Sequence, residues 1–346
     1  MPPDDAYAAA GVSIASSDAG VRALVDVLRT IDTGRPSRSL LGSGHYASVL
    51  QINPDLAIAL STDGVGSKLV VAEQTGRLST VGIDCIAMNV NDLICVGAEP
   101  LAMLDYIAVE QPDPAALAQI ATGLKIGAED AGIEIPGGEL AVLPELIRGH
   151  PSPNGFDLCG AAFGTVAPDA IVTGATIAPG QALIGLPSSG LHSNGYTLAR
   201  RALLELGGLG LDDTPPELGG ASVADVLLEP TVIYVRAVLE LLASPVDVHG
   251  LAHITGGGLT NLARLNDGVG FAIDSPLPVP AVFDLIARRG NVDEAELYDV
   301  FNMGCGFIAV VAEGDAEQAT AILSARHPGS ARIGTVTDRA GRIDRG

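Results

Sequence analysis

The chain has 346 residues, of which 47% are hydrophobic and only 3% aromatic, so it is long enough for two domains with an aliphatic, alanine-rich core. Its net charge of −22 argues against nucleic acid and anionic membranes as partners, because both are polyanions. An anionic substrate therefore needs a local positive site or metal ions. The acidic, arginine-biased composition reflects either genome composition or a saline habitat, and the sequence leaves both open.

Cysteine usage and the absence of apolar targeting segments indicate the compartment. The N-terminal residues include no apolar signal segment, and no apolar run reaches membrane-spanning length. The four cysteines form no Cys-x-x-Cys pair and lie in apolar surroundings, which is typical of free thiols in a reducing environment (Cys85, Cys95, Cys159 and Cys305). We therefore expect a cytoplasmic protein.

The first predicted helix begins after Ser16 and Ser17, which we expect to cap it, and its apolar stripe includes Val21 and Leu24. A glycine-rich loop follows, with a strand signal at 47–50 behind it. This loop is either a plain connection or a flap that covers phosphate groups; its residues of interest are Gly42, Gly44 and His45.

Residues 61–68 form the most informative stretch, because an apolar strand signal at 56–60 precedes them and a helix signal follows. Gly64, Val65 and Gly66 allow the backbone to approach an anion, and a helix N-terminus presents free N–H groups to phosphate. Asp63 is suited to magnesium, and Lys68 adds a positive charge. The spacing is not that of the Walker motif, and an ordinary turn is the alternative.

The choice of lysine at position 68 is unusual for this chain. Of its 19 basic residues, only Lys68 and Lys125 are lysines. A compact ammonium and a planar guanidinium are not interchangeable at a phosphate, so the choice favours a specific role for Lys68. Chance is the alternative explanation.

Residues 81–97 predict a helix with an apolar core face that ends at Gly97. Asp84, Asn91 and Asp92 are seven and eight residues apart, so they project from neighbouring positions along one side. An acidic helix face is usually solvated. Since the rest of this helix is almost wholly apolar, burial is favoured, and a buried carboxylate needs a cation or hydrogen-bond donors. A functional Asp92 and a solvated Asp92 both stay open.

The remaining segments predict interleaved helices and strands in two α+β domains. A strand is expected at 133–139, ending in a glycine turn that carries Glu139, and a linker at 168–180 sets the domains at 1–168 and 169–346. The other strands are expected at 101–109, 156–166, 182–186, 308–311 and 331–336, and the other helices at 112–131, 196–205, 223–243 with a break at Pro230, 259–265, 280–289 and 315–325.

Two further polar loops follow strand signals in the second half of the chain. One contains His192 and Asn194, and the other contains His253. Each stands between a strand and a helix, so each is another candidate anion-binding turn. A lone histidine is usually structural, so a structural role and a functional role both stay open for His192 and His253.

Five motifs stand in a fixed order along the chain: Thr-Asp-Gly-Val-Gly at 62–66, Gly-Gly-Glu at 137–139, His-Ser-Asn-Gly at 192–195, His-Ile-Thr-Gly-Gly-Gly at 253–258 and Phe-Asn-Met-Gly at 301–304. Together they resemble phosphoribosylformylglycinamidine cyclo-ligase, the aminoimidazole ribonucleotide (AIR) synthetase family, in its archaeal-type variant. The resemblance runs along almost the entire chain, and the His-Ser-Asn-Gly and His-Ile-Thr-Gly-Gly-Gly motifs are the most specific.

The resemblance implies a two-domain PurM-like ATP-binding fold, shared with selenophosphate synthetase, thiamine-monophosphate kinase and the hydrogenase maturation factor. The N-terminal β-sheet domains of a homodimer would pair into a barrel at the interface, and the C-terminal domain would be an α/β sandwich. The reaction would be the ATP-dependent cyclisation of formylglycinamidine ribonucleotide to aminoimidazole ribonucleotide in purine biosynthesis.

The resemblance also implies roles for the candidate residues. Magnesium would be held by Asp63, Asp92 and Glu139. The nucleotide would contact Gly42, Gly44, His45, the turn Asp63–Gly66, Lys68 and Asp92, and the catalytic set would be Lys68, His192, Asn194 and His253. With these residues the chemistry fits phosphoryl transfer, which needs mainly positioning and charge neutralisation.

Two departures from the family pattern affect this interpretation. Ser67 replaces the usual threonine but keeps its hydroxyl, whereas Leu140 replaces the threonine that normally follows Gly-Gly-Glu and loses it. Two alternatives therefore stay open. One is another ATP-dependent enzyme of the same superfamily, such as a small-molecule kinase. The other is a non-catalytic ATP-binding homologue.

Overall fold

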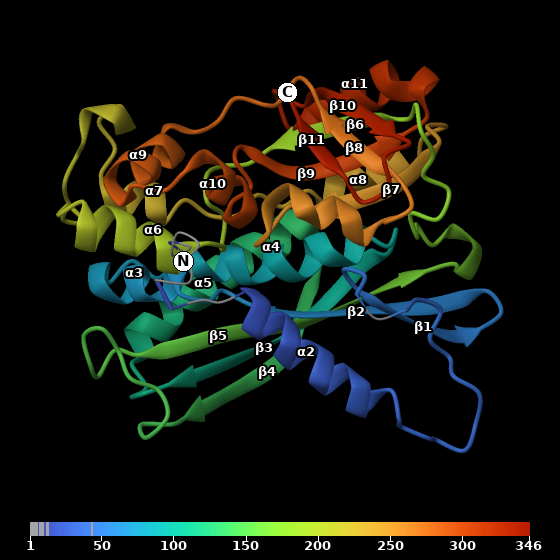
Figure 1. The fold of residues 1–346 in the computed structure, drawn as a ribbon. Coiled ribbons are helices and arrows are strands. Elements are labelled where there is room, and N and C mark those ends of the chain that lie inside the picture. Colours follow the sequence, from blue (N-terminus) through green and yellow to red (C-terminus); the bar gives the residue numbers. More distant parts are fainter. Residues whose placement is uncertain (1–5, 7–9, 12–13, 43) are drawn as a thin grey trace.

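The computed structural model describes residues 6, 10–11, 14–42 and 44–346. Its strands form two separate sheets, one from each half of the chain, with helices between and around them (Figure 1). Along the described part of the chain, no helix combines the length and apolar character that a membrane crossing requires.

The first sheet has five strands in the order β1-β2-β5-β3-β4. β3 and β4 are parallel and are joined through helix α5, whereas the other neighbours are antiparallel. Its strands are β1 (Ser48–Asn53), β2 (Leu56–Gly64), β3 (Glu99–Val109), β4 (Glu134–Val142) and β5 (Phe156–Val166), and the helices of this half are α2 (Ile14–Leu28), α3 (Lys68–Thr75), α4 (Val81–Ile94) and α5 (Pro114–Ala131).

The second sheet has six strands in the order β11-β8-β10-β6-β9-β7, with only β11 and β8 parallel. Its strands are β6 (Ala182–Pro187), β7 (Val248–His253), β8 (Gly270–Ile273), β9 (Cys305–Val311), β10 (Ala331–Thr337) and β11 (Ile343–Arg345). The α-helices of this half are α6 (Tyr196–Arg200), α7 (Val223–Leu227), α8 (Val235–Leu242), α9 (Ala281–Gly290), α10 (Glu294–Val300) and α11 (Ala316–Arg326).

Helix α4 is the centre of the molecule. It packs against β2, β3 and β5 of the first sheet, and it also contacts α8 and β7 of the second half. Every residue of α4 except Ile83 and Asp92 is buried. Gly82 permits close packing on α5, since a Cβ placed there would lie 2.3 Å from the backbone nitrogen of Leu124. The predicted core helix is confirmed, and it lies between the two halves of the chain (Figure 1).

Most predicted elements of the second half are confirmed. Helix α6 continues as a π-helix over Arg201–Leu206, and the segment Gly258–Arg264 is a 3₁₀-helix, not the expected α-helix. The predicted break at Pro230 separates α7 from α8. The expected domain boundary at residue 168 falls between β5 of the first sheet and β6 of the second.

Two local predictions were wrong. Helix α2 begins at Ile14, so Ser16 and Ser17 lie inside it and do not cap it, and its Val21 and Leu24 side chains are exposed. Strand β4 does not stop at a glycine turn, because Gly137 and Gly138 are part of it. A Cβ on Gly138 would lie 2.4 Å from Asp105 Oδ1, so glycine there makes room for a neighbouring carboxylate within a continuous strand.

Candidate active site

The predicted strand and helix at 56–75 are confirmed, but β2 continues to Gly64, so Asp63 lies in the last turn-facing part of the strand and the turn itself is confined to 65–67. Helix α4 holds this strand end in place. Asp63 donates its backbone N–H to Asn89 Oδ1 at 3.0 Å, and Asn89 Nδ2 donates back to the Asp63 carbonyl at 3.1 Å. The Asp63 carboxylate accepts the Gly64 N–H at 2.7 Å, and Gly66 adopts a positive φ of 73°. Sequence reasoning missed Asn89, whose only signal is a polar residue within a buried helix.

Burial raises the pKa of Asp63 above its usual value. The Gly64 N–H opposes this shift, the nearby Asp92 charge adds to it, and His253 and Arg264 lower the pKa of the same carboxyl. Asp63 and Asp92 therefore lie within electrostatic reach of each other, although they come from different elements. Two neighbouring carboxylates of this kind suit Mg²⁺, which needs only one or two carboxylates when phosphates supply further oxygens.

Asp92 and His253 form the direct contact between the two halves at this point. His253 Nδ1 lies 2.9 Å from Asp92 Oδ1, and the imidazole is fully buried at the end of β7. Since a carboxylate only accepts hydrogen bonds, Nδ1 carries a proton in this contact. Nε2 has no hydrogen-bond partner among the described residues. The geometry therefore leaves a carboxylate-supported imidazole with one open nitrogen.

The loop that follows β6 brings His192 and Asn194 to the same region. His192 is buried with a positive φ of 61°, and its Nε2 accepts the Ser189 N–H at 3.3 Å. Its Nδ1 has no partner among the described residues. Burial, with the charges of His253 and Lys68, holds the pKa of His192 well below its usual range. His192 is therefore a neutral imidazole whose Nδ1–H is available as a donor.

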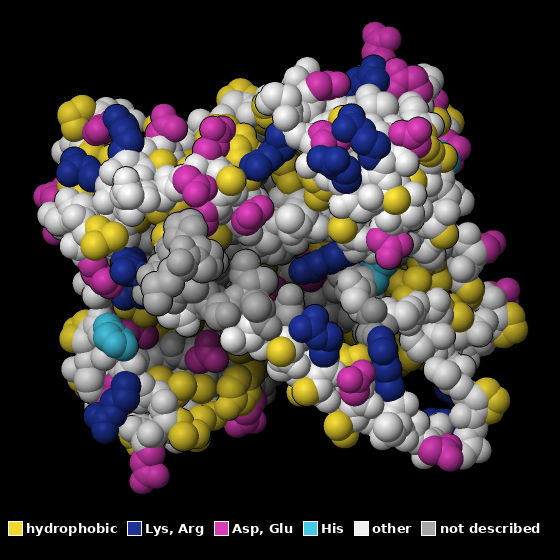
Figure 2. All heavy atoms as spheres, in the orientation of Figure 1, with side chains coloured by type: hydrophobic (Ala, Val, Ile, Leu, Met, Phe, Trp, Pro, Cys, Tyr) yellow, Lys and Arg dark blue, Asp and Glu magenta, His cyan; other side chains and the backbone are white. Residues whose placement is uncertain are grey.

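Asn194 joins this loop to the glycine turn after β7. Its Oδ1 would lie 3.2 Å from a Cβ placed on Gly256, and its Nδ2 is 4.0 Å from the sulfur of Met88 on α4. We call Asp63, Asp92, His192, Asn194 and His253 the junction cluster. In Figure 2 a furrow separates the upper and lower halves of the molecule, and basic and histidine side chains lie beside it.

The predicted flap borders the junction cluster through Tyr46. Tyr46 Oη donates to the Asn261 carbonyl at 3.1 Å, and the Arg264 guanidinium lies 5.3 Å from the centre of the Tyr46 ring. His45 is half-buried, and burial lowers its pKa, a shift that a hydrogen bond with the Thr173 backbone opposes. The predicted loop residues Gly42 and Gly44 are exposed. Sequence reasoning missed Tyr46, Asn261 and Arg264.

Lys68 is not placed as a free phosphate ligand. Its side chain is fully buried, with Nζ 2.8 Å from Asp84 Oδ2 and 2.9 Å from Asp84 Oδ1. The same ammonium donates to the backbone carbonyls of His192 at 3.2 Å and Glu229 at 2.6 Å. An ammonium has three N–H donors, and these acceptors occupy them. The geometry therefore gives no support to the prediction that Lys68 contacts phosphate.

The three predicted metal ligands are not brought together within one chain. Asp63 is in register with Gly160 and Asp105, whereas Glu139 is one residue out of that row and pairs with Tyr106. Because successive strand residues point to opposite faces, Glu139 lies on the other face of the sheet from Asp63. The described residues contain no group of three or more metal-ligating side chains.

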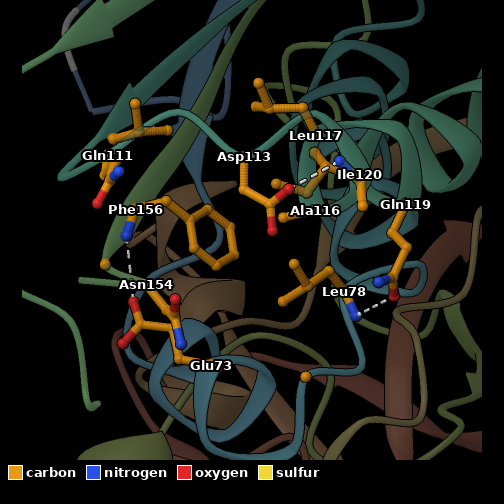
Figure 3. A pocket seen from close by; sticks show the side chains of 14 residues that line it. Glu73, Leu78, Gln111, Asp113, Ala116, Leu117, Gln119, Ile120, Asn154 and Phe156 are labelled. Carbon is orange, nitrogen blue, oxygen red and sulfur yellow. Dashed lines mark hydrogen bonds between the residues drawn. The ribbon is translucent and has the colours of Figure 1, made fainter. Parts of the chain in front are cut away.

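A separate cavity of about 180 Å³ lies between α3, the start of α5 and the ends of β3 and β5 (Figure 3). Glu73 lines it and accepts the backbone N–H groups of His150 and Phe156. The Phe156 ring faces Asp113 and Leu78 in this view. None of the predicted site residues lines this cavity, so it is distinct from the junction cluster.

Comparison with known proteins agrees with this two-part architecture. Residues 44–166 match the N-terminal domain of AIR synthase related proteins, and residues 178–344 match the C-terminal domain of the same family. The chain belongs to this family. Two similar relatives, both named phosphoribosylformylglycinamidine cyclo-ligase, come from Methanothermobacter thermautotrophicus (48% identity, 98% of this chain and 96% of the relative) and Pyrococcus furiosus (46% identity, 97% and 96%).

Solved structures show that the fold is PurM-like. The structure titled "AaThiL complexed with AMPPCP and TMP" superposes with a TM-score of 0.62 at 16% identity, over 92% of each chain. The hydrogenase maturation protein HypE in complex with ATP superposes with a TM-score of 0.60 at 20% identity, over 90% of this chain and 86% of that one. The chain thus has the two-domain α+β fold expected of the family.

Proposed function

We propose that this chain catalyses the ATP-dependent cyclisation of formylglycinamidine ribonucleotide to 5-aminoimidazole ribonucleotide, with release of ADP and phosphate, as a cytoplasmic step of purine biosynthesis. The names of relatives that are 46–48% identical over nearly the whole chain support this assignment. The structural observation that carries it is the Asp92–His253 pair, whose open Nε2 lies in the same cluster as a second carboxylate, Asp63.

In this reaction the γ-phosphoryl group moves to the amide oxygen, a nitrogen attacks the activated carbon to close the ring, and phosphate leaves. Asp63 and the free oxygen of Asp92 would hold Mg²⁺, which neutralises phosphate charge when it is bound. The neighbouring Arg264 is the cation of this region that has no ion pair with another described residue. The local positive site that an acidic chain requires is therefore made by magnesium and Arg264.

The two histidines take different parts in ring closure. His253 Nε2 accepts the proton that the attacking nitrogen loses, and Asp92 stabilises the imidazolium that forms. His192 stays neutral because its pKa is low, and its Nδ1–H donates to an oxygen of the substrate. Asn194, on the same loop, supplies a second polar group for orientation. The two histidines thus provide one proton acceptor, His253 Nε2, and one hydrogen-bond donor, His192 Nδ1–H.

The test measures ADP and aminoimidazole ribonucleotide in parallel, with formylglycinamidine ribonucleotide and magnesium-ATP as substrates. We expect equal amounts of both products from the wild-type protein, and we expect His253→Gln to lower the rate of aminoimidazole ribonucleotide formation about 10²–10⁴-fold. The control His150→Gln changes an exposed histidine and keeps activity. ADP without aminoimidazole would indicate a small-molecule kinase, and nucleotide binding without any turnover would indicate a non-catalytic homologue. Either result overturns the proposal.

We also propose the domain limits 1–168 and 169–346, and a homodimer in which the first sheets of two chains form a barrel. On the sheet face turned away from α4 and α5, Leu104 is 51% and Tyr106 41% exposed, and Leu60 and Phe163 are exposed in the same way. Hydrophobic side chains gather over β3, β4 and β5 in Figure 2. An apolar sheet face of this kind is typical of a subunit interface.

Glu139 lies on this same face, in register with Tyr106. Its carboxylate would therefore act across the subunit boundary, in the site of the second chain. To test the dimer, we would compare Leu104→Arg with Leu206→Arg, which changes an equally exposed leucine in the other half. We expect wild type and Leu206→Arg to sediment as dimers and Leu104→Arg as a monomer. A monomeric wild type would contradict the proposal.

A further inference from the structure

The buried Lys68–Asp84 pair joins four segments of the chain at one point. Lys68 is the first residue of α3, directly after the Asp63–Gly66 turn, and Asp84 lies on α4. The acceptor carbonyls belong to the loop after β6 and to the segment between α7 and α8. Asp84 Oδ1 also accepts the backbone N–H and the hydroxyl of Thr231, at 2.8 and 2.7 Å. The Lys68–Asp84 pair therefore links the N-terminal half of the molecule to the C-terminal half.

The carbonyl that Lys68 holds in the loop belongs to His192, which is strained. His192 has φ = 61°, a left-handed conformation that is uncommon for residues with a side chain and costs free energy. The orientation of this residue sets where its own ring and the adjacent Asn194 point. A hydrogen bond to its carbonyl from a buried ammonium is thus placed where it can fix the active conformation of the loop.

The geometry also explains why this position is lysine in a chain that otherwise uses arginine. The three acceptor groups approach from different segments, and the side chain has no exposed area. A compact ammonium can direct its three N–H bonds to such acceptors, whereas a planar guanidinium has a fixed fork and needs more space. The packing therefore explains why position 68 is lysine when 17 other positions are arginine, without assuming that Lys68 binds phosphate.

We propose that Lys68 is a positioning residue: neutralised by Asp84, it holds the His192–Asn194 loop in its working conformation and touches neither nucleotide nor substrate. Only the predicted loss of kcat/KM rests on the proposed function. The prediction that Lys68 is inaccessible and does not contact nucleotide can be tested on the wild-type protein without turnover, so it can fail independently of the proposed function.

The first experiment labels the wild-type protein with an amine-reactive reagent and reads each lysine by mass spectrometry. Lys125 is the internal control, because its side chain is 67% exposed. We expect complete labelling of Lys125 and none of Lys68, with no change when magnesium and a non-hydrolysable ATP analogue are added. Labelling of Lys68 that the nucleotide suppresses would make it a phosphate ligand and overturn the proposal.

The second experiment compares Lys68→Met, Asp84→Asn and the double variant, in which no unpaired charge is left. Positioning predicts that the ATP analogue binds the folded double variant within about threefold of wild type, while kcat/KM for the ribonucleotide falls about 100-fold or more. A phosphate ligand predicts weak nucleotide binding in both Lys68 variants and normal binding in Asp84→Asn. A purely structural pair predicts a double variant that regains activity together with its fold. Either of these two patterns overturns the proposal.

Discussion

Helix α4 carries two aspartates that each join the N-terminal half to the C-terminal half, and they differ in what they leave open. Asp84 is fully buried; its Oδ1 accepts from an ammonium, a backbone N–H and a hydroxyl, and its Oδ2 lies 2.8 Å from the same ammonium with no hydrogen bond of its own among the described residues. Asp92 is 16% exposed and holds only one nitrogen of His253, whose other nitrogen is unpartnered among the described residues. The same helix thus provides a closed structural contact at one end and a chemically open one at the other.

The two aspartates show how a structural group can be told from a reactive one by the hydrogen bonds that its partner leaves unmade. A fully buried carboxylate that is neutralised by a buried ammonium is closed to a ligand, and removing either partner lowers the stability of the fold. A buried imidazole with one unpartnered nitrogen destabilises the folded state, and a bound ligand can supply the missing hydrogen bond. We therefore expect changes at Asp92 and His253 to reduce turnover, and changes at Lys68 and Asp84 to reduce stability as well.

The largest effect is expected for His253→Gln. Loss of the proton acceptor should lower kcat about 10²–10⁴-fold, because this is the usual contribution of a positioned general base. Single-turnover formation of aminoimidazole ribonucleotide would measure it. His249 is the matched control, since it lies on the same strand beside Asp247, with its Nε2 3.2 Å from that carboxylate, but outside the junction cluster. Equal losses in both variants would show that His253 acts only through the strand.

Lys68→Met should give the second largest effect, a loss of about 3–5 kcal/mol in the free energy of unfolding, because it leaves the Asp84 carboxylate buried without its cation. Denaturant unfolding followed by circular dichroism would measure it. Lys125→Met removes the other lysine, whose exposed pair with Glu129 should contribute no more than about 0.5 kcal/mol. If the two variants lose similar stability, the buried pair is not the anchor that its geometry indicates.

Lys68 also shows the limit of what the sequence could predict. The strand, the glycine turn and the helix start are local features, so their pattern predicted them correctly. The alignment of Asp84, Asn91 and Asp92 along one side of α4 was predicted for the same reason. The partners of Lys68 are 16, 124 and 161 residues away, and only the packed structure brings them to it.

The candidate site divides in the same way. The motifs identified Asp63, Asp92, His192, Asn194 and His253, and the structure places them along helix α4. The pairing of Asp92 with His253 is a contact between elements of different halves, which spacing along the chain does not encode. Glu139 was misplaced because β4 continues through its two glycines, and alternation along the strand then puts its side chain on the opposite face from Asp63.

The third prediction concerns pH and the neutral His192. Its pKa is well below the usual value in the folded state, so below about pH 6.5 the unfolded chain binds a proton that the folded chain does not. Stability therefore falls as pH decreases, by up to about 1.4 kcal/mol per pH unit. We expect the unfolding free energy of wild type to drop more steeply from pH 6.5 to 5 than that of His192→Asn. The difference between the two removes the contributions of other groups, and equal slopes would contradict a buried neutral imidazole.

The smallest effect is expected at Leu140, where the family usually has a threonine. Leu140 is 43% exposed on the edge strand β4 and pairs with Ile107, so its side chain lies on the face opposite to Glu139. Leu140→Thr should change the unfolding free energy by less than about 0.5 kcal/mol, since surface substitutions away from special features usually do. Its kcat should stay within about twofold of wild type. A large gain in kcat would mean that the missing hydroxyl belongs to the reaction, and that β4 takes part in the site together with the Asp92–His253 pair.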